Sequence, residues 1–275
     1  HEDLGPVLFK QEIGHDFVVS GDQVFTDETL EAVKKNIREP EQENVLGKTR
    51  INGLQIWKHP IPKQRYVVGV DTSTGTGDDY SSIEIMNVEN YEQVAEYKGQ
   101  VATKTFGKLV KKLARYYNEA YTVIESNGIG EAVFNEVYYS ENDPYNNVYR
   151  IKKTKNGVVR MTGWETTVKS RQVMINNLID WLSVDDLFEQ LKIYSKRIYN
   201  EMITFVWKNG KAEHADGSHD DSLIALGLCL YFRNKAESAG ESFLISEDGD
   251  FIGTNNKKDL EDVKETDGFD FASTD

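Results

Sequence analysis

An apolar run of strand length, Tyr66-Val67-Val68-Gly69-Val70, is followed directly by the acid Asp71. A run of this kind is typical of a central strand that is covered on both faces of a sheet. A glycine-rich turn comes next and reads Thr72-Ser73-Thr74-Gly75-Thr76-Gly77. We therefore expect a buried strand over residues 66–70, with the Asp71 carboxylate at its end.

Strand-like and helix-like patterns alternate along the residues that follow. A near-continuous apolar run at 220–232 predicts a buried helix that opens on acids. The other predicted elements are strands at 82–88, 93–97, 121–124 and 147–151, helices at 104–120, 130–139, 170–182 and 195–206, and a hairpin-like turn at 208–211. This order predicts an α/β domain in which helices pack on a mixed central sheet.

The composition changes at two places along the chain. Residues 1–62 contain a short amphipathic stretch at 29–37 and end in a segment punctuated by Pro60 and Pro62, which predicts a linker before a compact domain over 63–235. Residues 236–275 contain twelve Asp and Glu against three Lys, and we expect this acidic tail to be disordered in large part.

Overall composition excludes several classes of protein. The chain of 275 residues has 39% hydrophobic and 28% charged residues, which fits a globular protein, although its net charge of −14 is unusual for one that binds nucleic acid. No apolar run reaches the roughly 18–20 residues of a membrane span. The single cysteine, Cys229, excludes both an internal disulfide and a cysteine-based zinc site.

Three acidic positions stand at the ends of predicted apolar elements. Asp71 ends the first strand, Glu125 follows the strand at 121–124, and Asp220-Asp221 opens the last helix. Each acid alone is more typical of a turn or a helix cap. Together at the strand ends of an α/β sheet they would repel one another, and a divalent cation would relieve that repulsion. The pattern therefore predicts a site for Mg²⁺ or Mn²⁺, with two ions as in phosphodiester hydrolysis.

The motifs around these acids resemble those of a known family. They are Val68–Asp71 with Gly75, Gly77 and Asp79-Tyr80, then Val123–Asn127 with Gly128 and Gly130, and then Asp216–Ser222. In this order they resemble the nuclease domain of the large terminase subunit, the DNA-packaging protein of tailed bacteriophages, and in particular the contractile-tailed type. Gly163–Thr166 resembles the same family. Phe9–Glu12 and Ser20-Gly21 are similar to the end of its ATPase domain, which would make residues 1–62 the end of the ATPase lid region and the linker.

The resemblance implies a ribonuclease H-like fold and a metal-dependent endonuclease that cuts concatemeric viral DNA during packaging. The metal ligands it implies are Asp71, Glu125, Asp220 and Asp221, with Asp79 as an additional one. Adjacent helical residues point about 100° apart, so the choice between Asp220 and Asp221 as primary ligand stays open. His219 is a candidate auxiliary group, for which helix capping is an equally good interpretation. The turn at 72–74 lacks the Glu that close relatives carry there.

The same resemblance implies partners and a location. The partners are double-stranded DNA, the portal protein and the small terminase subunit, with no membrane. The location is the host cytoplasm and, transiently, the portal of the viral prohead, but not the mature virion. We expect the packaging ATPase to lie outside this chain. Gly47-Lys48-Thr49 mimics a phosphate-binding loop, but Gln42 stands where that loop requires a glycine.

Two other interpretations fit parts of the sequence. The segment Asp71–Gly77 also resembles the phosphate loop of sugar kinases and actin-like ATPases, which share the same core sheet. Such an ATP-binding domain would need a second glycine-rich segment and an adenosine motif downstream, and we find neither. The second alternative is a non-catalytic module that docks on the viral portal and keeps the acids for structure alone.

Basic residues gather between positions 150 and 171, where Glu165 is the one acid. A local excess of positive charge is suited to DNA phosphates, although a solvated loop explains it equally well. The candidate DNA contacts are Arg150, Lys152, Lys153, Lys155, Arg160, Lys169 and Arg171. A second group of cations, within the predicted helix at 104–120, is more typical of a solvated helix face.

Overall fold

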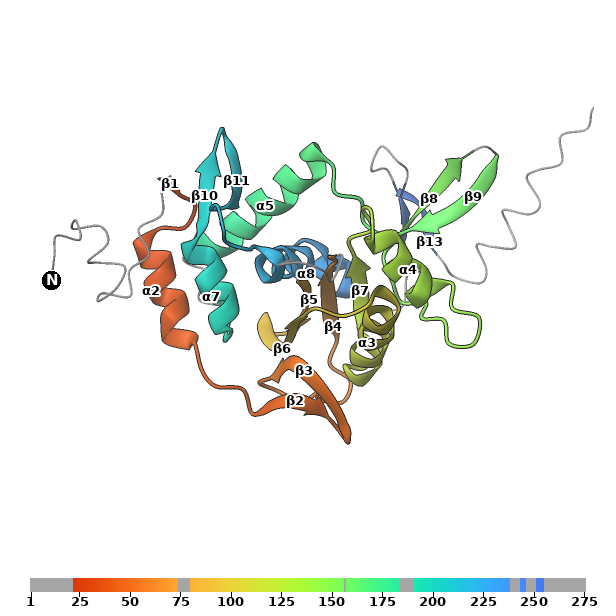
Figure 1. Ribbon diagram of the computed structural model, residues 1–275, viewed down its shortest axis with the longest axis horizontal. Coiled ribbons are helices and arrows are strands. Elements are labelled where there is room, and N and C mark those ends of the chain that lie inside the picture. The colour runs from red at the N-terminus through yellow and green to blue at the C-terminus, as the bar shows by residue number, and fades with distance from the viewer. Residues whose placement is uncertain are drawn as a thin grey trace, which may run out of the picture.

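The computed structural model describes residues 22–73, 80–155, 157–183, 190–237, 243–245 and 251–254 (Figure 1). Its centre is a six-stranded sheet with the order β2-β3-β6-β5-β4-β7. The strands are β2 (Gln42–Leu46), β3 (Thr49–Ile56), β4 (Tyr66–Asp71), β5 (Ser81–Asn87), β6 (Glu92–Gly99) and β7 (Tyr121–Ile124). β7 runs parallel to β4, and the other neighbours are antiparallel. The predicted mixed sheet is therefore confirmed.

Helices cover both faces of this sheet. One face carries α2 (Asp27–Asn36), α5 (Val168–Ser183), α7 (Lys196–Ile203) and α8 (Asp221–Glu237), and the other carries α3 (Thr103–Tyr116) and α4 (Gly130–Tyr138). Alternate residues of each strand serve the two layers because side chains along a strand point to opposite faces. Val67 and Val123 pack with α8, whereas Val68 and Val70 pack with α3 and α4. The continuous apolar run in β4 follows from this double burial.

A glycine lets α8 lie directly on the central strand. A side chain added at Gly69 of β4 would place its Cβ 2.0 Å from the carbonyl oxygen of Ala225 in α8. Only glycine permits this approach of two backbones. The close packing holds the N-terminal end of α8 near the end of β4, where Asp71 lies.

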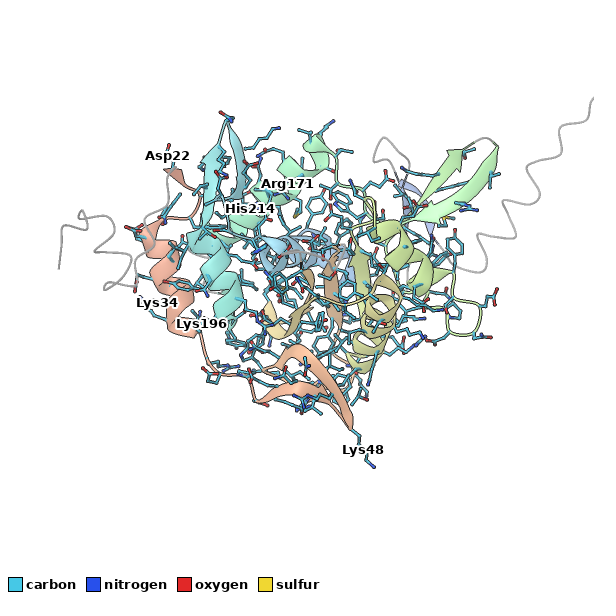
Figure 2. The ribbon with its side chains drawn as sticks, in the orientation of Figure 1. Asp22, Lys34, Lys48, Arg171, Lys196 and His214 are labelled. Atoms are coloured by element: carbon cyan, nitrogen blue, oxygen red, sulfur yellow. The ribbon has the colours of Figure 1, made fainter. Side chains whose placement is uncertain are left out.

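The segment before residue 63 contributes to the same fold. β3 pairs with β6, so the β2–β3 hairpin extends the sheet, with Lys48 at its tip (Figure 2). α2 packs against the α5, α7 and α8 side through Leu30 and Val33. Thus the described part of the region that we expected to be a lid and linker is continuous with the sheet, and the sheet itself begins at Gln42 rather than after Pro62.

Two smaller sheets complete the structure. In the first, β1 (Asp22–Gln23), β10 (Phe205–Lys208) and β11 (Lys211–His214) pair in that order. The predicted turn is confirmed, with positive φ angles at Asn209 and Gly210. The helix predicted at 195–206 was too long, because α7 ends at Ile203 and the chain enters β10.

The second small sheet includes a two-stranded hairpin that projects from the body of the protein (Figure 1). It has the order β13-β12-β8-β9, formed by β8 (Arg150–Lys155), β9 (Val158–Thr162), β12 (Phe243–Ile245) and β13 (Phe251–Thr254). β12 and β13 belong to the acidic tail, and β12 pairs in parallel with β8. The remaining tail residues, beyond Glu237, lie outside the described part. No helix of the described residues has the length and apolarity to cross a membrane.

Candidate active site

Strand register brings Asp71 and Glu125 together. β4 and β7 are parallel, with Val70 opposite Ile124, so the next residues, Asp71 and Glu125, are neighbours at the same edge. Both belong to the alternating set that faces α8, in line with Val67 and Val123. The charge of Glu125 acts directly on the Asp71 carboxyl group. The structure therefore brings Asp71 and Glu125 together at one edge of the sheet.

The loop after β7 is built tightly around Glu125. The Glu125 amide donates to the carbonyl of Val70 at 3.0 Å, and its carbonyl accepts from the Thr72 hydroxyl at 3.3 Å. A Cβ on Gly130, at the start of α4, would lie 2.0 Å from the same carbonyl oxygen. These contacts fix the backbone from which the Glu125 carboxylate projects.

The electrostatics of Asp71 reflect the crowding of acids. Burial raises the pKa of Asp71 well above its ordinary value, and the charge and hydrogen bond of Glu125 raise it further. The charges of Asp221 and Asp220 act in the same direction. Four carboxylates from β4, β7 and α8 therefore share one electrostatic environment that favours the arrival of positive charge.

Asp220 is held by two basic side chains from elements at the surface. Arg171 of α5 contacts one carboxylate oxygen at 2.9 Å, and Nδ1 of His214 in β11 lies 3.1 Å from the other. Figure 2 shows both residues above α8. Burial raises the pKa of Asp220, but the hydrogen bond of His214 and the charge of Arg171 outweigh it and lower that pKa. Arg171, which we predicted to contact DNA, thus pairs with a site acid in this structure.

Asp221 has a partner from the interior of the protein. The Lys98 ammonium of β6 lies 2.9 Å from Oδ2 of Asp221 and 2.5 Å from Oε1 of Glu201 in α7. The other oxygen of Glu201 accepts a hydrogen bond from the backbone amide of Leu223 at 2.7 Å, so Glu201 also caps the first turn of α8. Burial would lower the pKa of Lys98, but Glu201 and Asp221 raise it.

His219 lies beside the acids without a short contact to them. Its Nδ1 is 3.9 Å from Oδ2 of Asp221, and its ring packs edge-on against Tyr80 with 5.6 Å between centroids. Tyr80 in turn lies 5.4 Å from the Lys98 ammonium. Asp79, predicted as an additional ligand, lies outside the described residues.

Sequence reasoning missed Lys98, Glu201 and His214. Lys98 in β6 and Glu201 in α7 are distant in sequence from Asp221, whereas His214 in β11 lies six residues before Asp220. None of the three has a motif around it. The one available signal was the acidic and basic residues within the otherwise apolar β6, because a charge in a buried strand needs a partner.

The donor chemistry of the cluster suits a hard divalent cation, since carboxylate oxygens are the ligands that Mg²⁺ and Mn²⁺ prefer. Among the side chains that the structure describes, however, no three acidic, histidine or cysteine groups are arranged to hold a metal ion together. In this structure Lys98 lies against Asp221, and Arg171 and His214 lie against Asp220. The donor types of the four acids nonetheless fit a divalent metal.

The family of the chain follows from comparison with known proteins. A model of the terminase RNaseH-like domain matches residues 68–229, which is more than half of the chain and spans all four acids. The chain belongs to this family. The ribonuclease H-like fold that the motifs implied is thereby confirmed.

Solved structures agree with the fold of this terminase domain. The large terminase nuclease of thermophilic phage G20c with bound magnesium is 17% identical, with a TM-score of 0.57 over 76% of this chain and 97% of that one. The form with bound cobalt is 19% identical, with a TM-score of 0.56 and the same coverage. The nuclease domain of Thermus phage P74-26 is 17% identical, with a TM-score of 0.51 over 73% and 93%.

In the basic stretch of the terminase domain, some side chains are exposed and others contact neighbouring protein groups. Lys152, Arg160 and Lys169 are exposed. Arg150 is buried and donates to the carbonyl of Asn146 at 2.9 Å, so its inclusion among the DNA contacts was wrong. Lys153 is paired with Glu165. The Lys155 side chain lies outside what the structure describes.

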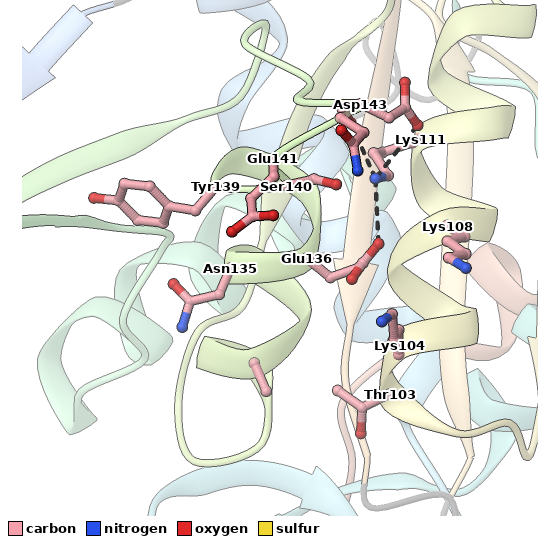
Figure 3. A pocket seen from close by; sticks show the side chains of 12 residues that line it. Thr103, Lys104, Lys108, Lys111, Asn135, Glu136, Tyr139, Ser140, Glu141 and Asp143 are labelled. Carbon is pink, nitrogen blue, oxygen red and sulfur yellow. Dashed lines mark hydrogen bonds and ion pairs between the residues drawn. The ribbon is translucent and has the colours of Figure 1, made fainter.

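A pocket of about 910 Å³ lies between α3 and α4 of the terminase domain, apart from the four acids (Figure 3). Lys104 and Lys108 of α3 line one wall. Lys111 on the same helix is buried and contacts Glu136 at 3.3 Å and Asp143 at 3.4 Å. Lys111 and its two acidic partners lie apart from the four acids, so they can be compared with the buried ion pair of Lys98.

Proposed function

We propose that this terminase domain is a metal-dependent endonuclease that cuts concatemeric viral DNA during packaging. The observation that carries the proposal is the convergence of Asp71, Glu125, Asp220 and Asp221 at one edge of the sheet, where the pKa of Asp71 is raised by burial and by the other three acids. Acids that disfavour one another's charge in this way are typical of a site that binds cations.

The four carboxylates would hold Mg²⁺ or Mn²⁺, and we propose two ions. Bound there, the ions would supply activation of water and stabilisation of the leaving oxygen in phosphodiester hydrolysis. The protein's part is to keep Asp71 and Glu125 fixed at the ends of adjacent strands and to present Asp220 and Asp221 at the start of α8. The helix N-terminus adds a favourable dipole for these negative charges. Asp79 and His219 remain candidate auxiliary groups.

DNA would be held mainly through its phosphates, as cutting without strict sequence preference requires. The exposed cations Lys152, Arg160 and Lys169 are our candidates for these contacts. The wider setting that we propose is a packaging complex with the portal protein and the small terminase subunit, in the host cytoplasm and at the prohead portal.

Cleavage of supercoiled plasmid DNA with Mg²⁺ or Mn²⁺ tests the proposal. The unmodified protein should nick the plasmid, and chelation of the metal should stop it. Asp71→Asn with Glu125→Gln should lower the rate at least about a hundredfold, because two metal ligands lose their charge. Asp216→Asn is the matched control. Asp216 lies on the loop before α8, is fully exposed and pairs with Lys208. This variant should leave the cleavage rate unchanged. Equal nicking by the double variant would refute the metal site.

A further inference from the structure

We propose that the Lys98 ammonium neutralises Asp221 until a divalent cation binds, and that Glu201 then keeps the ammonium while Asp221 turns to the metal. Lys98 and Glu201 are thus positioning residues that act through Asp221. The proposal rests on the metal-dependent nuclease function proposed above.

The ammonium already has two anionic partners in one small space. Its nitrogen lies 2.5 Å from Glu201 and 2.9 Å from Asp221, and only 14% of the Lys98 side chain is exposed. A buried ammonium without a counter-ion is strongly unfavourable. If Asp221 were its only partner, a metal that took Asp221 would leave that unfavourable state behind. Glu201 removes this obstacle because it remains as a partner.

Glu201 is fixed, whereas the lysine side chain is flexible. The Oε2 atom of Glu201 accepts the Leu223 amide at 2.7 Å, and only 7% of its side chain is exposed. The carboxylate is therefore held by the α8 backbone that also carries Asp221. Lys98 reaches it on a four-carbon stem, so a small rotation moves the ammonium away from Asp221 without breaking its contact with Glu201.

The neighbouring acid shows why Asp221 needs such a device. The partners of Asp220, Arg171 and His214, have side chains that are 32% and 48% exposed. On release from Asp220 they can be solvated by water. The Lys98 side chain is much less exposed, so its charge must be balanced by an anion inside the protein.

A double-mutant cycle on Mn²⁺ binding tests this role without DNA cleavage. Isothermal titration with MnCl₂ at pH 8, without DNA, compares the unmodified protein with Glu201→Gln, Lys98→Met and the double variant. Glutamine keeps the acceptor for the Leu223 amide but loses the charge that retains the ammonium. We expect Glu201→Gln to weaken Mn²⁺ binding roughly tenfold or more, because the metal must then break the Lys98–Asp221 ion pair with no second anion to keep the ammonium.

The variants at Lys98 distinguish this role from two simpler ones. Lys98→Met should not weaken Mn²⁺ binding, and adding Glu201→Gln to it should cause no further loss. If Lys98→Met weakens binding as much as Glu201→Gln does, the ammonium is a fixed clamp and the proposal is wrong. If Glu201→Gln causes the same loss in both backgrounds, Glu201 acts independently of the Lys98 ammonium, and the proposal is again wrong.

Lys111→Met controls for the loss of a buried lysine, because Lys111 is 2% exposed and paired with Glu136 and Asp143 away from the acids. It should bind Mn²⁺ as the unmodified protein does, with urea unfolding confirming that each variant is folded. If the unmodified protein neither binds Mn²⁺ nor nicks DNA, the proposed nuclease function fails and the inference fails with it. If it does both while the cycle is additive, only the inference fails.

Discussion

Asp220 and Asp221 are adjacent in the chain, yet their surroundings differ. Asp220 faces cations from α5 and β11, and Asp221 faces an ammonium from the centre of the sheet. Both raise the pKa of Asp71, with the charge of Asp221 the larger contributor of the two. Asp221 therefore acts on Asp71 more strongly than Asp220 does, and we propose Asp221 as the primary partner of Asp71 in the proposed metal site.

A second pair of acids, buried between β5 and β6, gives a prediction for pH dependence. Glu84 and Glu96 are cross-strand neighbours and are each 1% exposed. Burial and then the charge of Glu96 raise the pKa of Glu84 well above its ordinary value. A raised pKa in the folded state means that stability is lost as pH rises through that pKa. Glu84→Gln should therefore be more stable than the unmodified protein at pH 8.5, by about 1 kcal/mol, and the difference should shrink towards pH 5.

Urea unfolding at the two pH values measures this difference. Glu89→Gln is the control with the opposite sign, because the Arg65 hydrogen bond lowers the pKa of Glu89 at the exposed end of the same strand pair. Glu89→Gln should cause a small loss of stability, and this loss should appear only above the pKa that Glu89 has in the unfolded chain. A stabilisation by Glu84→Gln that is equal at both pH values would contradict the account of the buried pair.

At the scale of elements, the contact between β4 and α8 is the most restrictive. We predict that Gly69→Ala destabilises the protein by at least about 2 kcal/mol, because the new Cβ would overlap the Ala225 carbonyl. It should also slow DNA cleavage, since α8 carries Asp220 and Asp221. Gly47→Ala has open space around it and adopts φ +58°, so it should cost only about 1 kcal/mol of backbone strain. Equal unfolding midpoints in urea for the two variants would argue against close packing as the cause.

The β8–β9 hairpin gives a prediction about DNA. Reversing the charge of both Lys152 and Arg160 to Glu should weaken DNA binding and reduce the slope of log affinity against log salt by about two, if each contacts one phosphate. Binding is measured without divalent metal so that the DNA stays intact. Lys48→Glu, at the tip of the β2–β3 hairpin, should leave the slope unchanged (Figure 2). A slope that is the same in all three proteins would exclude the hairpin as a phosphate-binding surface.

The elements that sequence predicted best are those whose pattern is local. β4, β7 and α8 are buried on more than one side, so their apolar runs carry the signal by themselves. β2 and β3 mix exposed and buried positions at a sheet edge, and their pairing is set by β6, which local pattern does not reveal. Phe205 and Val206 fit helical spacing, but pairing with β1 and β11 makes them a strand.

At the scale of the whole molecule, the four acids could be located because each ends a predictable element. Their partners could not, because Lys98 and His214 meet the acids, and Glu201 meets Lys98, only through tertiary packing. The same reason explains Arg171. Its place in a basic stretch indicated a phosphate contact, and only the packing of α5 beside α8 shows its ion pair with Asp220.

The acidic tail leads to a prediction about the whole chain. Twelve of its residues are acids, and its strand β12 pairs with β8 of the basic hairpin. Truncation after Glu237 should tighten DNA binding several-fold at low salt, because a negative segment near the proposed phosphate-binding surface is removed. The gain should disappear at high salt, where exposed charges are screened. Fluorescence anisotropy with labelled DNA measures both conditions, and an unchanged affinity at low salt would contradict this role of the tail.

Binding of divalent metal by the four carboxylates is tested most directly in crystals of the protein soaked in Mn²⁺, through the anomalous signal of the metal. We expect anomalous peaks beside Asp71, between Glu125 and the Asp220-Asp221 pair, and their loss in Asp71→Asn. If the protein cuts DNA with Mn²⁺ but its soaked crystals show no peak at these acids, or a peak elsewhere, the four carboxylates are not the metal site.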